Sequence, residues 1–417
     1  FFLTFGLSAC LLGSACSSDG NESPDETQNQ RTDISLSESS KAVASDLNNF
    51  YINFTIQAVE QSMKDEENLT KNVVVSPFST SLLLGMLANG IGTVSNAQDI
   101  AKYLGVKDLN ALNEFSHDIM LSLPEVDKQA NLLLANSVWL NDRFKLSPSF
   151  YSTMLQDYLA DIFEMNFSNP SMLQAVVNDW VDRITNQTVS YIPYNGDALS
   201  MAILINALYF KNKWENEYEF DTSKTTHEVF NGFSGPRNTD FMVSTASYRF
   251  FSGSENFTAC WFYFGNGAFS LMLVLPDDRI SSQELDKLLT QDEYNTLTTN
   301  ALGCGVEIKI PKFKIQCSTD LNKIFYEAGL EAITSENLWS MFSPAMVGSV
   351  SMTQHTCFEI DEQGVTSSAV SEGVIAPSAT NFNPETTQKM VFDRPFYFFI
   401  REVSTGACLL SGFIADL

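Results

Sequence analysis

The chain has few of the side chains that enzymes use for acid–base or nucleophilic catalysis. Its three histidines, His117, His227 and His355, are far apart in the sequence, and none has the spacing of a metal-binding pair. Asp361 and Glu362 are adjacent, so in an extended strand they point to opposite faces and make a poor acid–base pair. Nucleophile-elbow, zincin, phosphate-loop and dinucleotide-binding motifs are also lacking. We therefore expect no enzyme, no cofactor and no metal.

Composition narrows the remaining classes. The 417 residues carry a formal net charge of −26, from 50 acidic and 24 basic side chains. Nucleic-acid binding needs a basic surface, so this charge argues against it and favours a well-hydrated protein. Hydrophobic residues form 44% of the chain, enough for one large core or two ordinary ones. The seven cysteines show no C-x-x-C spacing, so neither a zinc site nor a disulfide framework is indicated.

A stretch late in the chain is more informative than these side chains. Phe358 and Ile360 alternate with polar residues, which predicts a strand that ends at an acidic turn near Glu362. The following residues 365–371 are all small or β-branched, and no proline or basic residue interrupts them. Such residues suit a pleated strand, although a surface loop does not need them. The sequence predicts a long loop that extends to Pro395, and loops of this length are usually functional.

Strands and helices predicted by the apolar pattern surround this loop. Strands are expected over residues 132–140, 203–211, 271–276, 306–313, 392–400 and 408–414, and helices over residues 43–59, 77–88 and 321–330. The near-continuous apolar run at 203–211 is typical of a strand buried on both faces. Asn206 in its middle is then a buried polar group that must be hydrogen-bonded. Ser76, which precedes Pro77, is suited to cap the helix that follows.

The order of these motifs resembles the serpin family, from about residue 45 to residue 417. The residues that carry the resemblance are Ser76 and Ser79, the strand 203–211 with Trp214, the Pro-Lys-Phe motif at 311–313, the loop that starts at Glu362, and Asp393-Arg-Pro-Phe396. The resemblance implies an α+β fold in one domain over residues 41–417. It also implies three β-sheets, surrounding helices and an exposed reactive loop at about residues 362–391. Taken alone, the loop could be a Ser/Thr-rich connection between two strands.

The resemblance implies a monomeric, suicide-type inhibitor of serine proteases. The protease would cleave the loop and form an acyl-enzyme, and the freed half of the loop would insert as a strand into the main sheet. The intact protein would then be metastable. The implied hinge consists of Glu362, Gly364, Val365, Thr366, Ser367, Ser368 and Ala369, and the implied sheet-opening region of Ser76, Ser79, Asn206 and Gln354. The alternative is a non-inhibitory serpin that acts as a binding or chaperone-like surface lipoprotein.

The loop sequence is compatible with insertion. Alternate residues must enter the core when the loop becomes a strand. The inward face would consist of Val365, Ser367, Ala369, Ser371, Gly373 and Ile375, which are all small or apolar. The only charge, Glu372, would lie on the outward face. Ser367 and Ser368 stand where inhibitory serpins more often have alanine, and a buried serine needs a hydrogen-bond partner.

The reactive bond is expected between Ser378 and Ala379, counted from Glu362 by the family's spacing. The loop is several residues longer than usual, so the window also includes Ile375, Ala376, Pro377 and Thr380. Residues 374–380 are small or apolar, with no lysine, arginine or large aromatic residue. This composition favours an elastase-like or subtilisin-like serine protease, because a trypsin-like pocket would find no cation to pair with.

The first 16 residues resemble a bacterial lipoprotein signal. The apolar run turns polar directly after Cys16, which is the expected lipidation site, with Cys10 as the alternative. Residues 17–40 are almost devoid of apolar side chains and are expected to form a flexible tether. We thus expect a protein anchored by lipid to the bacterial cell envelope, in the outer membrane, where exposure at the cell surface is one arrangement. A plain secretory peptide and a secreted protein are the alternative.

Overall fold

The computed structural model describes residues 31–65, 70–187, 199–215, 218–277, 280–281, 283–284, 287–365 and 387–417, without the side chains of 245–248 and 332. Its α-helices are α1 (Glu38–Lys64), α2 (Pro77–Gly90), α3 (Val94–Tyr103), α4 (Leu109–Ser122), α5 (Pro148–Gln156), α6 (Pro170–Ile184), α7 (Gln291–Thr299), α8 (Leu321–Glu327) and α9 (Glu331–Thr334). Its strands are β1 (Val73–Val75), β2 (Asn131–Asn141), β3 (Asp161–Met165), β4 (Ala202–Lys213), β5 (Thr226–Gly232), β6 (Gly235–Gly253), β7 (Phe257–Phe264), β8 (Phe269–Pro276), β9 (Leu302–Pro311), β10 (Phe313–Asp320), β11 (Asn337–Trp339), β12 (Met346–Gly348), β13 (Thr353–Ile360), β14 (Gly364–Val365), β15 (Thr387–Val391), β16 (Phe396–Glu402) and β17 (Cys408–Ile414).

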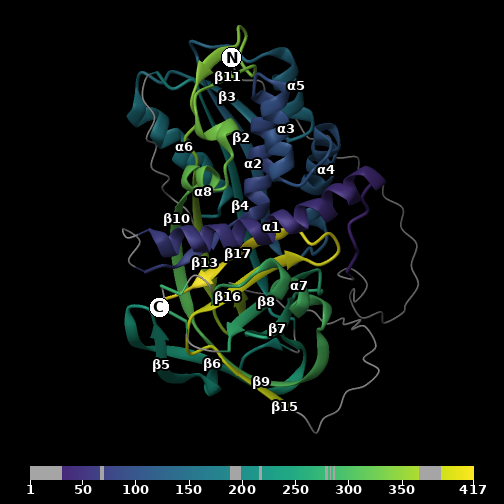
Figure 1. Ribbon diagram of the computed structural model, residues 1–417, viewed down its shortest axis with the longest axis vertical. Helices are drawn as coiled ribbons and strands as arrows, with labels where there is room; N and C mark the ends of the chain where they lie inside the picture. The colour runs from purple at the N-terminus through teal and green to yellow at the C-terminus, as the bar shows by residue number, and fades with distance from the viewer. Residues whose placement is uncertain are drawn as a thin grey trace, which may run out of the picture.

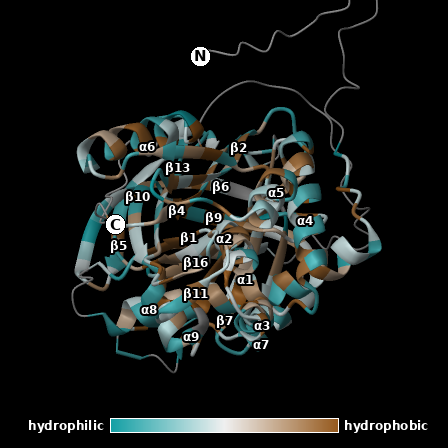
Figure 2. Ribbon diagram, turned by 90° about the horizontal axis from the view of Figure 1, so that it is seen from above, coloured by the Kyte–Doolittle hydropathy of each residue, from teal (hydrophilic) through white to brown (hydrophobic). Residues whose placement is uncertain are grey.

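The strands form a mixed α+β architecture of several sheets (Figure 1). The largest sheet has the order β1-β17-β16-β8-β7-β6-β9-β15, and β5 pairs with β6 at its side. A second sheet has the order β14-β4-β2-β3. Two antiparallel pairs, β10 with β13 and β11 with β12, complete the set. Seen from above, strands β1, β4 and β16 lie in the middle beside α2, and helices α4, α6, α8 and α9 lie at the margin (Figure 2).

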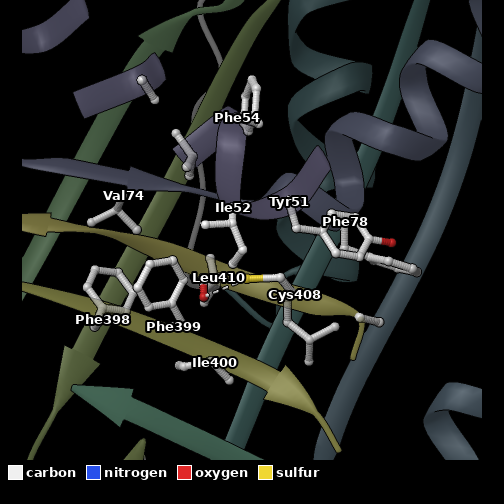
Figure 3. Close-up of a cluster of buried hydrophobic side chains, with 14 of the residues drawn as sticks. Tyr51, Ile52, Phe54, Val74, Phe78, Phe398, Phe399, Ile400, Cys408 and Leu410 are labelled. Carbon is white, nitrogen blue, oxygen red and sulfur yellow. Dashed lines mark hydrogen bonds between the residues drawn. The ribbon is translucent and has the colours of Figure 1, made fainter. Parts of the chain in front are cut away.

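The main core lies between helix α1 and the buried strands β16 and β17. Ile52 on α1 points toward Phe399 and Leu410 on these strands, and all three are buried (Figure 3). Every residue of β17 is buried, which explains why its sequence is a continuous apolar run. Burial of this kind contributes roughly 1.5–3 kcal/mol for each large side chain, so it holds β16 and β17 firmly in the core.

Three predicted elements begin later, end earlier or are divided. The strand expected over 392–400 begins only at Phe396, because Pro395 has no N–H group and Arg394 turns aside to bind the Pro276 carbonyl oxygen at 2.7 and 3.0 Å. The strand expected over 306–313 divides at Lys312 into β9 and β10. The helix expected over 321–330 ends at Glu327, since Gly329 takes the left-handed conformation with a φ of 73°.

The folded region begins before Lys41. Helix α1 starts at Glu38 and is capped by Ser37, whose hydroxyl accepts the Ser40 N–H. Upstream, Leu36 is buried and the Ile34 N–H donates to the Ser404 hydroxyl at 3.0 Å. The residues just before α1 therefore lie against the domain.

Candidate functional site

A cavity of about 680 Å³, the central cavity, separates β4 from β13. These strands belong to different sheets, although each is well paired on its other side. The cavity is lined by residues 200–211 along β4, by residues 349–357 along β13, and by residues of α2 between them. Among the described residues, only the two-residue strand β14 pairs within this gap. The central cavity has the length of a strand and is open along its edges for main-chain pairing.

The central cavity also corrects one expectation about β4. We expected this strand to be buried on both faces, but Ala202–Asn206 are only partly buried. The sequence of β4 is apolar because both faces of the strand contact apolar side chains. One face packs on the main core, and on the other Ile203 and Ile205 pack against side chains of α6. The edge toward β13 stays open, and this is why burial is incomplete.

A tight turn connects β13 to the start of the loop. Asp361 and Gly364 exchange main-chain hydrogen bonds of 3.1 and 3.2 Å, and the Asp361 carboxylate accepts the Gln363 N–H at 2.8 Å. The Trp214 indole donates to the Asp361 carbonyl oxygen at 2.9 Å. The acidic turn expected after Ile360 is thus present, and it is fastened to the end of β4 through Trp214.

Gly364 and Val365 form β14, which pairs antiparallel with β4. Gly364 lies opposite Lys213, and Val365 opposite Asn212. Gly364 has a φ of 124°, and a Cβ there would lie 2.5 Å from the Asn212 carbonyl oxygen, so only glycine fits. Val365 is 4% exposed and belongs to the main core, as expected for the first inward residue. The hinge therefore starts inside the gap rather than on the surface.

Glu362 is held by two partners. Its carboxylate accepts the Thr225 hydroxyl at 2.6 Å and forms an ion pair with the Lys312 ammonium at 2.9 Å. Burial alone would raise the pKa of Glu362, but the hydrogen bonds from Thr225 and Lys312 outweigh it and lower that pKa. The hydrogen bond to Glu362 in turn raises the pKa of Lys312. The two interactions fix the turn to β5 and to the β9–β10 junction.

The sheet-opening region is centred on Gln354. Its side-chain oxygen accepts the Ser76 N–H at 2.8 Å, and its amide donates to the Ser76 carbonyl oxygen at 3.1 Å and to the Thr80 hydroxyl at 3.3 Å. The Ser76 hydroxyl donates to Ser79 at 2.8 Å and caps α2 by accepting the Ser79 N–H. These bonds attach β13 to the first turn of α2.

Asn206 is bound on the opposite side of the same cavity. Its amide donates to the Asn136 side-chain oxygen at 2.8 Å, and Asn136 donates to the Tyr158 carbonyl oxygen at 2.7 Å. The Asn206 Oδ1 atom is buried and has no hydrogen-bond partner. Asn206 is therefore hydrogen-bonded, as expected, and its partner is Asn136 on β2; it keeps one unsatisfied acceptor.

The structure places some of the predicted site residues and not others. Ser76, Ser79, Asn206 and Gln354 all line the central cavity, and Val365 lines its end. Outside the described residues lie the hinge residues Thr366, Ser367, Ser368 and Ala369, the reactive-bond window Ile375, Ala376, Pro377, Ser378, Ala379 and Thr380, and the cysteines Cys10 and Cys16.

Sequence reasoning missed the partners of these residues. Lys312 and Thr225 were not expected to hold Glu362, nor Thr80 and Asn136 to hold the sheet-opening region. Asn136 could have been found, since it is a lone amide inside an apolar strand, as Asn206 is. Lys312 lies in the Pro-Lys-Phe motif, a base between two strands, whereas nothing distinguishes Thr225 locally.

The remaining chemistry-bearing side chains form no second site. His117 contacts the Gln156 carbonyl oxygen, His227 pairs with Asp240 at 3.0 Å, and burial lowers the pKa of His355. In the described part of the chain, no three side chains of the metal-binding types cluster, and the five cysteines there are free thiols. None of the described helices is both long and apolar enough to span a bilayer.

Comparison with known proteins agrees with this geometry. The family model for serpins, serine protease inhibitors, matches residues 51–417. Serpin-ZX of Arabidopsis thaliana is 29% identical, with 83% of this chain and 92% of the relative covered. Intracellular coagulation inhibitor 1 of Tachypleus tridentatus is 27% identical, with 85% and 87% covered.

Solved structures show the same fold. Native tengpin, a thermophilic serpin, has a TM-score of 0.75 and 25% identity, with 93% of this chain and 97% of that chain covered. Arabidopsis AtSerpin1 in its native stressed conformation has a TM-score of 0.73, with 92% and 99% covered. The chain belongs to the serpin family, whose members are protease inhibitors rather than catalysts.

Proposed function

We propose that this serpin is a suicide-type inhibitor of serine proteases that traps the acyl-enzyme by inserting its cleaved loop between β4 and β13. One observation carries the proposal: β14 already pairs with β4 at the mouth of a strand-length cavity in which no other described residue pairs. The protease serine oxygen attacks the carbonyl carbon of the reactive bond and forms an ester. The amine on the other side of the bond leaves with a proton, and the freed segment extends β14.

The two pairings at the turn give a register for the inserted strand. Val365 is opposite Asn212 on β4, and Gly364 is opposite Asp361 next to β13. Continued residue by residue, these pairings place Ser371 between Asn206 and Gln354. The same continuation ends with Ile375 opposite Ala202, the first residue of β4. All ten residues from 366 to 375 thus find partners on β4.

This register supports insertion on chemical grounds. Ser371 arrives beside Asn206 Oδ1, the buried acceptor that has no partner in the intact protein. A hydroxyl there would satisfy that acceptor, and leaving it unsatisfied costs about 1–3 kcal/mol. Ser367, in contrast, arrives between Phe210 and Phe358, which offer no hydrogen bond from their side chains. Insertion is therefore favourable at one serine and costs free energy at the other.

The proposed target is an elastase-like or subtilisin-like protease, cleaving between Ser378 and Ala379. The small and apolar residues 374–380 support this choice. The proposed location is the bacterial envelope, with lipid on Cys16, and the support is the change from apolar to polar sequence after that residue. In the proposed state the intact molecule is a metastable monomer.

Incubation with elastase, subtilisin and trypsin, followed by a denaturing gel, tests the inhibitory function. We expect an SDS-stable complex with elastase or subtilisin and none with trypsin. The cleaved serpin should also melt at a higher temperature than the intact one. Clean cleavage without complex, and an unchanged melting temperature, would show a non-inhibitory serpin of the binding or chaperone-like kind.

A further inference from the structure

A groove of about 360 Å³, the α1–α3 groove, lies between helix α1 and the end of helix α3. Four polar side chains line it from α1: Asp46, Asn49, Asn53 and Gln57. They are three or four residues apart, so they share one face of the helix and extend along it for about 16 Å at ~1.5 Å per residue. No described residue lines both this groove and the central cavity, so the two are separate features.

The opposite wall of the groove is formed by residues 102–105, where α3 ends. Gly105 has a φ of 79°, the left-handed conformation that favours glycine, and it ends the helix here. A Cβ at this position would lie 3.4 Å from the Asp46 carbonyl oxygen, so a larger side chain at 105 would narrow the groove. Glycine therefore keeps this end of the groove open.

The floor of the groove is apolar. Phe50 and Phe54 are 4% and 0% exposed, and their rings stack with centroids 5.6 Å apart. The Tyr103 ring meets Phe50 edge to face at 5.6 Å, and the Tyr103 hydroxyl donates to Gln57 Oε1 at 2.6 Å. Burial raises the pKa of Tyr103, so the hydroxyl keeps the proton for this bond. Because Gln57 Oε1 is occupied by Tyr103, its Nε2 group remains as a donor toward a ligand.

Folding stability does not account for the amides on this face of α1. The side chains of Asp46, Asn49 and Asn53 form no hydrogen bond or ion pair with any residue that the structure describes. Asparagine is also a poorer helix former than alanine, lysine or glutamate, which usually occupy exposed helix positions. Residues 47–59 nevertheless contain no charged side chain. A ligand in the groove would supply the partners that these amides lack within the protein.

The polar groups of the groove select the chemical class of this ligand. The amides of Asn49 and Asn53 each offer donors and an acceptor, Asp46 offers only acceptors, and Lys102 offers only donors. An ammonium ligand has no acceptor for the amide N–H groups, and a sulfate has no donor and would be repelled by Asp46. A hydroxyl both donates and accepts, so a row of neutral hydroxyls matches the whole set.

We propose that the α1–α3 groove binds a neutral oligosaccharide. Asn49, Asn53 and Gln57 bond its hydroxyls, and the C–H faces of the sugar rings pack on the apolar floor. The size of the groove and its apolar floor with a few polar groups are typical of small-ligand sites. The sugars could belong to a free glycan or to the headgroup of a glycolipid, since both present the same hydroxyls. The inference is independent of loop insertion, because no residue of the groove belongs to the hinge.

The test uses the full chain and a panel of immobilised neutral oligosaccharides built from glucose, mannose, galactose and N-acetylglucosamine. We expect saturable binding to at least one of them and none to a sulfated oligosaccharide. The double variant Asn49→Ala, Asn53→Ala should bind that sugar roughly tenfold more weakly, because two hydrogen-bonding side chains are lost. The control Asn110→Ala replaces an exposed asparagine on α4, outside the groove, and should bind like the wild type. Since alanine is the better helix former, neither variant should melt below the wild type.

Three results would overturn the inference: no saturable binding to any neutral oligosaccharide, equal binding by the wild type and the double variant, or a preference for the sulfated sugar. If the inference holds, competition between the free sugar and vesicles that carry it as a glycolipid distinguishes the two sources. Tighter binding to the vesicles identifies a lipid headgroup, and equal binding identifies a free glycan. Protease inhibition by the double variant should equal that of the wild type, so the result is separate from the proposed function.

Discussion

Val365 pairs with Asn212 across the antiparallel ladder between β14 and β4, and its side chain is buried in the main core. The loop thus enters the gap between β4 and β13 in a defined register. Because side chains alternate between faces along a strand, this single pairing determines which later residues would face the core. If the strand continued in this register, Ser367, Ala369, Ser371, Gly373 and Ile375 would share the face of Val365, which is the inward face predicted from the sequence.

Replacement of Ala369 by arginine should convert the inhibitor into a substrate. Ala369 would lie between Leu208 and Thr356 on the core face, where an unpaired charge is costly to bury. Glu372→Arg is the matched control, since residue 372 lies on the other face and is already charged. The stoichiometry of inhibition should rise strongly for Ala369→Arg and little for Glu372→Arg. Equal loss of complex in both variants would show that the register is wrong.

The two serines on the core face should have opposite effects. Ser371→Ala leaves Asn206 Oδ1 without its partner, so the cleaved form should lose about 1–2 kcal/mol of unfolding free energy. Ser367→Ala removes a hydroxyl from between two phenylalanines and should stabilise the cleaved form or leave it unchanged. Guanidinium unfolding of the cleaved variants measures both effects. Equal destabilisation by the two substitutions would contradict the predicted neighbours.

The Glu362–Lys312 ion pair should stabilise the turn at the start of the hinge in the intact protein. Glu362→Gln removes the charge at a 7% exposed position and leaves Lys312 without its ion pair. We expect a loss of roughly 1–3 kcal/mol in the intact form and faster spontaneous insertion or self-association. Glu359→Gln is the control, since Glu359 pairs with the more exposed Lys314. Thermal unfolding and native gels after incubation at 37 °C will distinguish the two variants.

The same pair should make hinge stability depend on pH. The pKa of Glu362 is lowered in the folded state, so its stabilising contribution is present above its usual pKa of 4.5 and is lost as the pH falls below that value. The pKa of Lys312 is raised, so its contribution is lost only as the pH rises above 10.5. Between about pH 5 and pH 3, the wild type should lose more stability than Glu362→Gln. Identical profiles would contradict this role.

The elements that hold the site were predictable because their patterns are local. The alternation around Phe358 and Ile360 predicted β13, and the apolar run after Cys408 predicted β17 with its bounds. Glycine at 364 was expected in the hinge, and its backbone conformation now explains the need for it. These features depend on residues close together in the sequence.

The contacts that close the site were not predictable, because they join distant segments. Glu362 meets Thr225 across 137 positions, and Gln354 meets Ser76 across 278. No periodicity connects such residues, and hydrogen bonding between them depends on how the sheets are placed. The open edge of β4 was also missed, because an apolar sequence does not show whether a strand is paired on one edge or on both.

The anchoring residue can be tested by a pair of cysteine variants. Cys16→Ala should release the protein from the membrane fraction, because the apolar-to-polar change occurs directly after Cys16. Cys10→Ala should leave it attached. Fractionation of cells that express each variant, with detection by antibody, gives the answer. Release by Cys10→Ala alone would move the attachment to that residue, and a soluble wild type would indicate a secreted protein.

The position of the reactive bond follows from the length of β4. In the proposed inserted form, Ile375 would be the last loop residue with a partner on that strand, so a bond at Ser378 would leave three residues to span the end of the sheet. A bond before Ile375 would leave part of the cavity unfilled. A bond far beyond Thr380 would place extra flexible residues between the inserted strand and the protease, so insertion would distort the protease less. The window from Ile375 to Thr380 is thus favoured by geometry as well as by composition.

Mass spectrometry of the peptide released on complex formation will identify the bond. Cleavage after Ser378 gives a C-terminal fragment that begins at Ala379. Replacement of Ser378 by arginine should then redirect the inhibitor toward trypsin-like proteases, because the new side chain pairs with the acidic pocket of such enzymes. Lys389→Ala is the control and should change nothing, since Lys389 lies within β15, paired with β9. A fragment that begins at Met390 would place the bond after Lys389 and overturn both the position and the predicted specificity.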